Sequence, residues 1–462
     1  MKGNQLLQGF YILLLASCFV LLAEGITNKQ LPTNNLVQHL EDTLIQATAP
    51  VEVFVKDSLL AEEEKWEDEV PQAPEPQVIQ HKNLGRFFAA LDRVKVKKGK
   101  ARIAYFGDSM IEGDLVTESL RNDFQELFGG TGVGFVPLTS KTYGFRKTIK
   151  HRFAEKWKNF NLLSPNPTKH SFGISGEFFL AGSSSAKDAW VRYETTDAYQ
   201  RTQIFEKVRM YYGQRISKSA GKNPYLIVST NDNKDTLTLS DRKLVNAVTL
   251  AEEPTEEISL NFGIPSDMPV YGLSFESEQG VFLDNYSSRG NSGMNLVQIP
   301  SVTLKEFYAH LEYDLVVLHF GLNVVSPKRK SFRSYERGMK NVIKHFQEFM
   351  PNADILMISV SDKSTKIEGE LQTDPSVPLI VEAQRRVADE MNVAFLDLYR
   401  GMGGRNSMIR WVNANPSLAR SDYTHPNRRG AAKVGSIIKA HLLKEYDKSK
   451  QPQGQRTFAR AY

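Results

Sequence analysis

Cysteine is nearly absent from this chain of 462 residues, in which Cys18 is the only one. A single cysteine excludes an intramolecular disulfide framework and a cysteine-based zinc site. Its place near the N-terminus also excludes a cysteine nucleophile in the later, folded part of the chain. Zinc-finger patterns, RNA-binding signatures and heptad repeats are absent from the sequence as well, so we expect no nucleic-acid partner. We predict no protein partner.

Positive charge is scarce in the first part of the chain and abundant in the rest. The formal net charge is +5. Residues 29–80 hold three basic and eleven acidic residues, a net of −8, so the remainder carries +13. A basic body suggests an anionic partner such as an acidic polymer. Hydrophobic content of 41% and charged content of 24% are typical of a soluble globular protein, and the length predicts a two-domain body with extra segments.

The first 26 residues have the pattern of an export signal. Lys2 precedes an apolar run from Leu6 to Ala23, and a charged start followed by such a run is typical of exported proteins. At about 18 residues the run is just long enough for an uncleaved membrane anchor, whereas Leu15-Ala16-Ser17-Cys18 has the form of a lipoprotein cleavage box. Because the run continues beyond Cys18, we favour an anchor or a cleaved signal over a lipid on Cys18. We expect an exported protein of the cell envelope or periplasm, tethered to the membrane through residues 1–26.

The rest of the chain divides by composition into five segments. Residues 27–80 are acidic and end in a proline-containing stretch, which is typical of an extended spacer. Apolar residues at helical spacing before a short strand predict the first part of an α/β fold in 81–147. Alternating apolar residues between turn residues predict an inserted antiparallel β-sandwich in 148–286, and a βαβαβ succession predicts the second part of the α/β fold in 287–448. We expect a loose C-terminal tail in 449–462.

Residues 103–110 join a short apolar run to the tripeptide Gly107-Asp108-Ser109. The run predicts a buried strand, and the tripeptide predicts the turn at its end. The carboxyl end of a parallel strand is where open α/β sheets place their chemistry, although Gly-Asp-Ser alone is also an ordinary turn composition. Ser109 is therefore a candidate nucleophile if later residues supply the groups that a catalytic serine needs.

A catalytic serine needs a base to take its proton and an acid that orients the base. The segment Asp422-Tyr423-Thr424-His425 offers both, because two side chains three residues apart on a loop before a helix can lie side by side. We expect His425 to address Ser109 and Asp422 to hold the imidazole. Asp108 is then not the acid of the triad, and we expect it to support the turn that presents Ser109.

Acyl transfer also needs hydrogen-bond donors for the oxyanion of the tetrahedral intermediate. Gly290 lies in a predicted loop and is a candidate backbone donor, for which Gly293 is an alternative. Asn323 follows a predicted strand and is a candidate side-chain donor. Each of these residues, taken alone, is also consistent with plain turn chemistry.

Four motifs occur in the same order as the Ser, Gly, Asn and His blocks of the SGNH (GDSL-type) hydrolases. They are Gly107-Asp108-Ser109, Gly290, Gly321-Leu322-Asn323 and Asp422-x-x-His425. The chain resembles this family over about residues 81–150 and 287–446. The resemblance implies a flavodoxin-like three-layer α/β/α hydrolase with the β-sandwich inserted into it. It also implies Ser109 as nucleophile, His425 as base and Asp422 as its orienting acid.

The resemblance further implies an oxyanion hole made of the Ser109 and Gly290 N–H groups and the Asn323 side chain. Val324 departs from the family pattern, which usually has Asp after this Asn. The carboxylate at that position is usually supportive rather than catalytic, so the departure does not remove a catalytic group.

Further motifs resemble the bacterial subgroup that de-O-acetylates peptidoglycan: residues 107–114, Gly132-Val133-Gly134-Phe135-Val136 and Gly403-Gly404. Some members of that subgroup carry a carbohydrate-binding-like β domain at the place of the inserted segment. The resemblance implies a serine esterase without metal or organic cofactor that removes O-acetyl groups from a cell-envelope polysaccharide, such as peptidoglycan, through an acyl-enzyme. Two alternatives stay open: acetyl transfer to a sugar hydroxyl by the same triad, and a non-catalytic envelope protein whose inserted domain binds glycan.

Overall fold

The computed structural model describes residues 84–185, 187–216, 223–231, 233–264 and 267–451. The predicted signal or anchor in 1–26, the spacer in 27–80 and nearly all of the tail in 449–462 lie outside these residues. Within the described part of the chain, no helix has both the length and the apolar character that crossing a bilayer requires.

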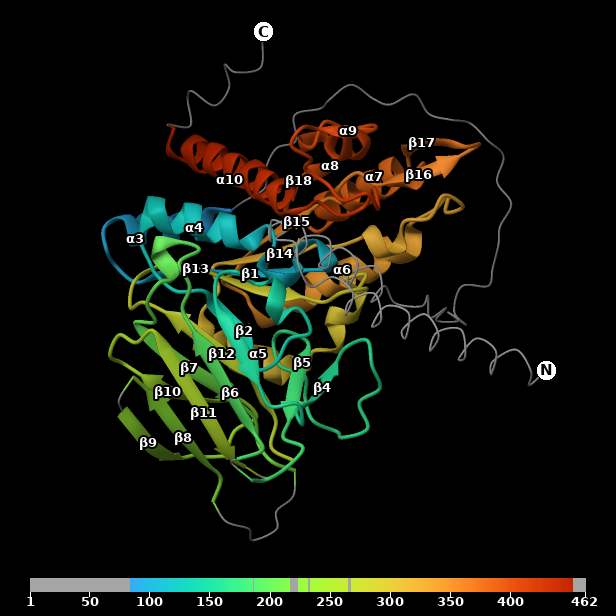
Figure 1. The fold of residues 1–462 in the computed structure, drawn as a ribbon. Helices are drawn as coiled ribbons and strands as arrows, with labels where there is room; N and C mark the ends of the chain where they lie inside the picture. The colour runs from blue at the N-terminus through green and yellow to red at the C-terminus, as the bar shows by residue number, and fades with distance from the viewer. Residues whose placement is uncertain (1–83, 186, 217–222, 232, 265–266, 452–462) are drawn as a thin grey trace, which may run out of the picture. The chain divides into compact units, whose positions relative to one another are not determined.

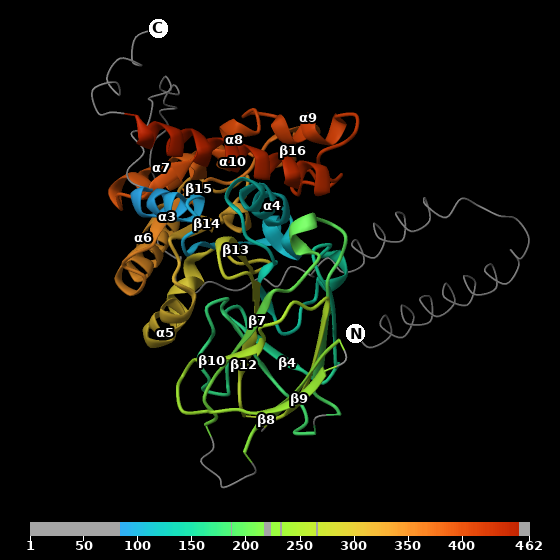
Figure 2. The same cartoon turned by 90° about the vertical axis from the view of Figure 1, so that its left-hand side faces the viewer.

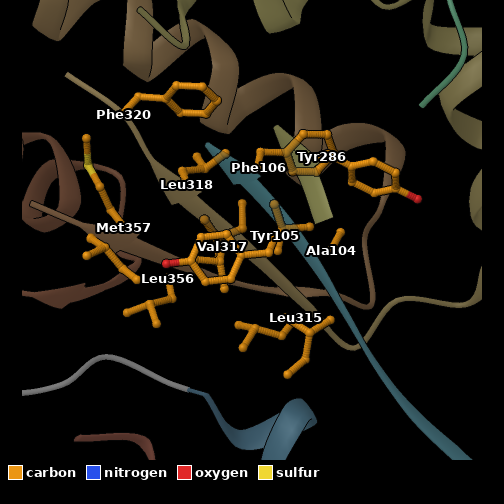
Figure 3. Close-up of a cluster of buried hydrophobic side chains, with 14 of the residues drawn as sticks. Ala104, Tyr105, Phe106, Tyr286, Leu315, Val317, Leu318, Phe320, Leu356 and Met357 are labelled. Atoms are coloured by element: carbon orange, nitrogen blue, oxygen red, sulfur yellow. The ribbon is translucent and has the colours of Figure 1, made fainter. Parts of the chain in front are cut away.

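A five-stranded parallel sheet forms the centre of the described chain. Its strands are β1 (Lys100–Gly107), β13 (Gly280–Ser287), β14 (Leu315–His319), β15 (Asp354–Ile358) and β18 (Ala394–Leu396). They run in the order β13-β1-β14-β15-β18, which is the 2-1-3-4-5 order of flavodoxin-like folds. Nearly every residue of these strands is buried, since helices cover both faces of such a sheet. Figure 3 shows side chains of β1, β14 and β15 gathered in the resulting core.

Two groups of helices flank this sheet. One group comprises α3 (Gly85–Lys95), α4 (Thr117–Phe128) and α10 (Arg428–Lys450), and the other α5 (Ser301–Leu311), α6 (Arg333–Phe349) and α7 (Ser376–Glu390). Helices within each group contact one another. Because β13 lies on one side of β1 and the later strands on the other, right-handed crossovers put α4 on the face opposite α5, α6 and α7. The predicted three-layer α/β/α fold is confirmed.

Two antiparallel sheets form a second core between β1 and β13 in the sequence, in green and yellow-green in Figures 1 and 2. One sheet contains β2 (Gly134–Pro137), β4 (Lys158–Asn161), β5 (Glu177–Leu180), β7 (Lys207–Tyr212), β10 (Asn246–Ala251) and β12 (Val270–Glu276). The other contains β3 (Lys150–Phe153), β6 (Trp190–Glu194), β8 (Tyr225–Thr230), β9 (Asn233–Thr238) and β11 (Glu257–Gly263). Buried side chains of both sheets, such as Phe179 and Val191, share one apolar cluster. The predicted inserted β domain is therefore present.

The boundaries of the insert differ from the predicted 148–286 at both ends. β13 falls inside the predicted insert but pairs in parallel with β1. β2 falls in the predicted first part of the α/β fold but pairs with β12 of the antiparallel sheet. Only three residues separate β12 from β13, and no helix comes between them, so the strand pattern continues across the boundary without a break that a sequence could show.

The remaining elements are short. They are α8 (Leu398–Gly401), α9 (Ser407–Asn413), the hairpin β16 (Ser364–Ile367) and β17 (Glu370–Thr373), and the 3-10 helices η1 (Ser109–Asp114), η2 (Tyr143–Phe145), η3 (Gln200–Thr202), η4 (Met294–Gln298) and η5 (Leu322–Val324). Two of them, η1 and η5, directly follow the strands β1 and β14 and carry residues of the candidate site.

A buried ion cluster joins the parallel and antiparallel sheets. The Arg102 guanidinium on β1 donates to Asp284 on β13, with Nε 2.7 Å from Oδ2, and also to Glu276 on β12. The Asp284 carboxylate in addition accepts from the backbone of Phe135 on β2 over 2.8 Å. All three charged side chains are at most 2% exposed, and removing one partner of such a buried pair is strongly destabilising.

The glycines from Gly129 to Gly134 lie at this same junction. The sequence predicts a turn here rather than a phosphate loop. At Gly132, where φ is +94°, a Cβ would lie 2.3 Å from the Phe275 carbonyl oxygen. A side chain does not fit there, so the glycine lets the chain pass close to β12.

Candidate active site

Ser109 lies at the carboxyl end of β1, as predicted, and is the first residue of η1. The Asp108 side chain caps this helix by accepting a hydrogen bond from the Met110 N–H over 3.0 Å. Gly107 is needed before the turn, because a Cβ there would lie 2.9 Å from the Ile111 side chain and 3.2 Å from the His319 carbonyl oxygen. The first N–H groups of a helix have no partner inside it, so the Ser109 N–H is available as a donor.

His425 and Asp422 lie on the loop before α10 and meet Ser109 there. The Oγ of Ser109 is 2.9 Å from Nε2 of His425, and Nδ1 of His425 is 2.8 Å from Oδ2 of Asp422. A proton on Nδ1 that is donated to the carboxylate leaves Nε2 as an acceptor for the serine hydroxyl. The structure thus brings together the three residues that the sequence predicts as a triad, in the order nucleophile, base and acid.

The Asp422 carboxylate is held ionised by its own loop. Its Oδ1 accepts the backbone N–H groups of Thr424 and His425, each over 2.9 Å. Burial works to raise the pKa of Asp422, but the hydrogen bonds from the side chain and backbone of His425 outweigh it and lower the pKa to about 2. Asp422 is therefore a carboxylate at neutral pH and can stabilise a positive charge on His425.

The loop that carries Gly290 is fastened to the end of β1. The Ser288 N–H donates to the Gly107 carbonyl oxygen over 2.8 Å. Gly290 is exposed, and within the described chain its N–H has no acceptor. The N–H of Gly293, the alternative donor, is taken by the buried Asn291 side chain over 2.8 Å. Of the two glycines, Gly290 is the one with a free backbone donor.

Asn323 lies on η5, just past the end of β14. Its Nδ2 donates to Oδ2 of Asp108 over 3.1 Å and to the Asn291 carbonyl oxygen over 3.0 Å. An amide nitrogen has two hydrogens, so both are engaged here. Asn323 is exposed, and donation to an oxyanion requires it to exchange one of these two hydrogen bonds.

Asp108 is almost completely buried between the turn and Asn323. Burial raises the pKa of Asp108 to about 6, although the hydrogen bond from the Met110 N–H works in the opposite direction. The predicted support for the turn is thus observed as a helix cap, and the contact with Asn323 adds a second link that the sequence does not reveal.

The ion pair between Arg289 and Glu112 at the site is not predicted by the sequence. Arg289, next to Gly290, donates from Nε to Oε2 of Glu112 over 2.7 Å. Glu112 lies three residues after Ser109 on η1. The pair therefore links the two segments that carry the candidate backbone donors. The sequence holds only a weak indication of this pair: Glu112 and Arg289 carry opposite charges next to the Ser and Gly motifs, and they are 177 residues apart.

The inserted region also reaches the site. Leu163, in the loop between β4 and β5, is 45% exposed, and its Cδ1 lies 3.9 Å from where a Cβ of Gly290 would be. This leucine adds an apolar surface beside the candidate oxyanion hole. Among the described residues, no group of three or more His, Cys, Asp or Glu side chains is arranged to hold a metal ion.

A serine with an adjacent histidine and carboxylate, at the carboxyl edge of a 2-1-3-4-5 sheet, defines the class of serine hydrolases. Residues 275–433 match the model of the GDSL-like lipase/acylhydrolase family. The matched region includes Gly290, Asn323, Asp422 and His425, whereas Ser109 precedes the insert. The chain therefore carries an SGNH (GDSL-type) hydrolase domain and is a serine hydrolase of the esterase type.

Among solved structures, one with a TM-score above 0.5 supports the same fold, and two others are similar chains below that value. A peptidoglycan O-acetylesterase is 19% identical, with a TM-score of 0.59 over 79% of this chain and 98% of that chain. An acetyl xylan esterase, AlAXEase, is 20% identical over 35% of this chain and 81% of its own, with a TM-score of 0.27. A family two carbohydrate esterase from Cellvibrio japonicus is 8% identical over 65% and 98%, with a TM-score of 0.25. A search of curated proteins found no matching sequence.

Proposed function

We propose that the protein is a serine O-acetylesterase that removes acetyl groups from a cell-envelope polysaccharide, most specifically peptidoglycan. The observation that carries the proposal is the chain of hydrogen bonds from Ser109 through His425 to Asp422. The fold supports it, because the likeness to a peptidoglycan O-acetylesterase extends over both the hydrolase fold and the antiparallel sheets.

Acylation begins with the attack of the Ser109 Oγ on the acetyl carbonyl carbon. The serine proton moves to Nε2 of His425, and the Asp422 carboxylate stabilises the imidazolium that forms. The N–H groups of Ser109 and Gly290, with the Asn323 amide, are the donors for the oxyanion. Collapse of the intermediate breaks the ester bond, His425 gives its proton to the departing sugar oxygen, and an acetyl group remains on Ser109.

Deacylation repeats these steps with water as the nucleophile. His425 takes a proton from the water as it attacks the acetyl carbon, and then returns a proton to Ser109 as acetate leaves. The His425 and Asp422 side chains are 34% and 45% exposed, so water reaches the base directly. This exposure favours hydrolysis over transfer of the acetyl group to a second sugar.

Two observations favour a polymer as substrate. The candidate site is open to solvent, and the Leu163 loop of the inserted region lies beside Gly290, where the sugar chain would continue. The basic charge outside residues 29–80 suits an anionic polymer. Peptidoglycan combines sugar hydroxyls that can be acetylated with carboxylates on its peptides.

The test is acetate release from O-acetylated peptidoglycan, acetylated xylan, acetylated alginate and a small aryl acetate, with Ser109→Ala as the control. We expect the wild type to release acetate from the small ester and from peptidoglycan, and the variant to release none above background. Acetate release by Ser109→Ala at a rate above background would contradict the proposed mechanism. Addition of a glycan acceptor separates hydrolysis from transfer, because only transfer yields newly acetylated sugar.

We also propose that the enzyme acts in the cell envelope, since the apolar run in residues 6–23 has the pattern of an export signal or anchor. Separation of cells into soluble and membrane fractions tests this, with the full chain compared with a chain that lacks residues 1–26. Equal distribution of the two chains would argue against a tether in this segment.

A further inference from the structure

The loop before α6 and the start of that helix carry a dense group of positive charges. Lys328, Arg329, Lys330 and Arg333 lie within six residues of one another, and residues 326–345 contain seven basic residues against one acidic residue, Glu336. Of the four named residues, Lys328, Lys330 and Arg333 are exposed and Arg329 is half-buried. Within the described chain, no carboxylate pairs with any of these four side chains. Pairing with neighbouring carboxylates therefore does not account for them.

Two of these charges, Lys330 and Arg333, line a hollow of about 170 Å³ between the start of α6 and the α7 residues Leu379 to Arg386. Lys330 and Arg333 line one side, Leu379 and Glu382 the other, and the buried Phe332 lies beneath. The two acidic side chains of the hollow already have partners. Arg386 Nη2 lies 2.5 Å from Glu336, and Arg385 Nε lies 3.5 Å from Glu382. The charge of Lys330 and Arg333 remains uncompensated, so the hollow is suited to an anionic group.

The hollow lies on the same edge of the parallel sheet as Ser109. Helices α6 and α7 begin after β14 and β15, at the carboxyl ends of the strands, and β14 is the direct neighbour of β1. Lys328 follows the candidate oxyanion residue Asn323 by only five residues. A polymer that presents one acetylated sugar to Ser109 continues for several sugars in both directions, so its neighbouring units can pass over this edge.

We propose that Lys328, Arg329, Lys330 and Arg333 form a subsite that binds carboxylates of the polymer substrate beside the catalytic centre. The proposal rests on the proposed esterase function and specifies that the polymer substrate is anionic. Carboxylates on a polymer come from two sources, the sugar ring itself or a peptide attached to it. Both satisfy the same guanidinium and ammonium groups, because Arg and Lys bind carboxylates by charge-assisted hydrogen bonds.

The test compares two double variants that remove the same charge. Lys328→Gln/Lys330→Gln changes the proposed subsite, and Lys98→Gln/Lys444→Gln is the matched control, with two exposed lysines near the opposite edge of the sheet. Initial rates are measured on O-acetylated peptidoglycan, with peptide carboxylates, on acetylated alginate, with ring carboxylates, on neutral acetylated xylan and on an aryl acetate.

We expect the subsite variant to raise KM about three- to tenfold for at least one anionic polymer, since each exposed charge contact contributes modestly. Its kcat, and both constants for xylan and the aryl acetate, stay at the wild-type level. The difference in KM disappears in about 0.5 M NaCl, where exposed charges are screened. An increase for alginate alone assigns the ring carboxylate, and one for peptidoglycan alone assigns the peptide carboxylate.

Three outcomes overturn the subsite: an equal rise in KM for xylan, an equal rise in the control variant, or unchanged KM for both anionic polymers. A charge-preserving variant, Lys328→Arg/Lys330→Arg, must keep wild-type KM, and its failure to do so also contradicts the proposal. Binding without catalysis is measured for the wild type and both double variants by cosedimentation with insoluble, de-O-acetylated peptidoglycan and by affinity electrophoresis in gels that contain non-acetylated alginate. Binding that is lost only in the subsite variant supports the subsite even where no ester is cleaved, in which case only the esterase function has failed.

Discussion

The side-chain amide of Asn323 donates a hydrogen bond to the Asp108 carboxylate, with Nδ2 3.1 Å from Oδ2. The other carboxylate oxygen accepts the Met110 N–H in η1, so Asp108 contacts both the candidate oxyanion donor Asn323 and the turn that carries Ser109. The residue before the nucleophile thus supports both the turn that presents Ser109 and the orientation of the Asn323 amide. This relationship makes Asp108 a positioning residue with a measurable effect.

Asn323→Ala removes a donor to the oxyanion and should lower kcat about 10²-fold or more with little change in KM, as loss of such a donor does elsewhere. Steady-state kinetics on an aryl acetate provide the measurement. A rise in KM at unchanged kcat would instead mean that Asn323 binds the substrate in its ground state.

Asp108→Asn places an NH₂ group opposite the Asn323 NH₂ group or the Met110 N–H and leaves one donor unpaired. We expect kcat to fall about tenfold, because an unsatisfied buried donor costs about 1–3 kcal/mol and the turn or the Asn323 amide shifts to relieve it. The matched control is Asp374→Asn, which changes another buried carboxylate that accepts the Ser376 N–H at the start of α7, over 2.9 Å. A comparable loss of kcat in the control would show that any buried Asp is needed for folding, and would remove the special role of Asp108.

Asp422→Asn separates orientation of the base from its charge. The asparagine oxygen can still accept the N–H groups of Thr424 and His425, but its amide then faces Nδ1 of His425 and favours the wrong tautomer. We expect kcat to fall about 10³- to 10⁴-fold. The double variant with Ser109→Ala should be no slower than Ser109→Ala alone, because the members of a triad act as a unit. Additive losses would contradict the assignment.

The close approach of Ser109, His425 and Asp422 can be predicted from the sequence because its signals are local. A glycine and a serine at a strand end, and Asp422 three residues before His425, each form a short motif that the backbone alone brings close to its final geometry. The three-layer fold can also be predicted from the sequence, because the spacing of apolar residues differs between buried parallel strands and amphipathic helices. The hydrogen-bond partners of the Asn323 side chain cannot be predicted from the sequence, because Asp108 and Asn291 come from two other segments.

Contacts between distant segments account for the other differences. The parallel pairing of β13 with β1 joins residues about 180 positions apart, and the sequence around Gly280 reads as one more strand of the insert. The link between Arg289 and Glu112 is likewise invisible until the fold brings the two loops together. Local pattern thus predicts which residues meet at the candidate site, while long-range packing decides how those residues are held.

The Glu112–Arg289 pair should hold the two candidate backbone donors at a fixed spacing. Glu112→Gln and Arg289→Gln should each lower kcat a few-fold, and the double variant should lose no more than either single one, because both remove the same interaction. The Arg289 side chain is 51% exposed, so the effect is modest. The control is Lys207→Gln, which breaks the pair between Lys207 on β7 and Glu278 in the connection from β12 to β13, 2.6 Å apart. Fully additive losses in the double variant would show that the pair does not act as a unit.

His151 on β3 makes the antiparallel part of the protein sensitive to acid. It is buried, its Nε2 lies 2.9 Å from the Leu138 carbonyl oxygen, and its ring stacks on Tyr193. Burial lowers the pKa of His151 to about 3 from its ordinary value of 6.5. Below about pH 6.5 the His151 ring is protonated in the unfolded chain but stays neutral in the folded chain. The folded state therefore becomes less stable as the pH falls below 6.5. This one residue should reduce the free energy of unfolding by about 2 kcal/mol between about pH 8 and pH 5.

Two variants of His151 remove the titration in different ways. His151→Gln keeps a donor for Leu138 but loses the ring, and His151→Phe keeps a ring against Tyr193 but loses the donor. Both should be less stable than the wild type at about pH 8, yet both should lose about 2 kcal/mol less on going to about pH 5. Urea unfolding at the two pH values measures this difference. The slope that remains belongs to other groups, including the buried His319, whose pKa is lowered by burial to about 4. A wild-type slope in both variants would mean that His151 titrates alike in the folded and unfolded chains, and would contradict the lowered pKa.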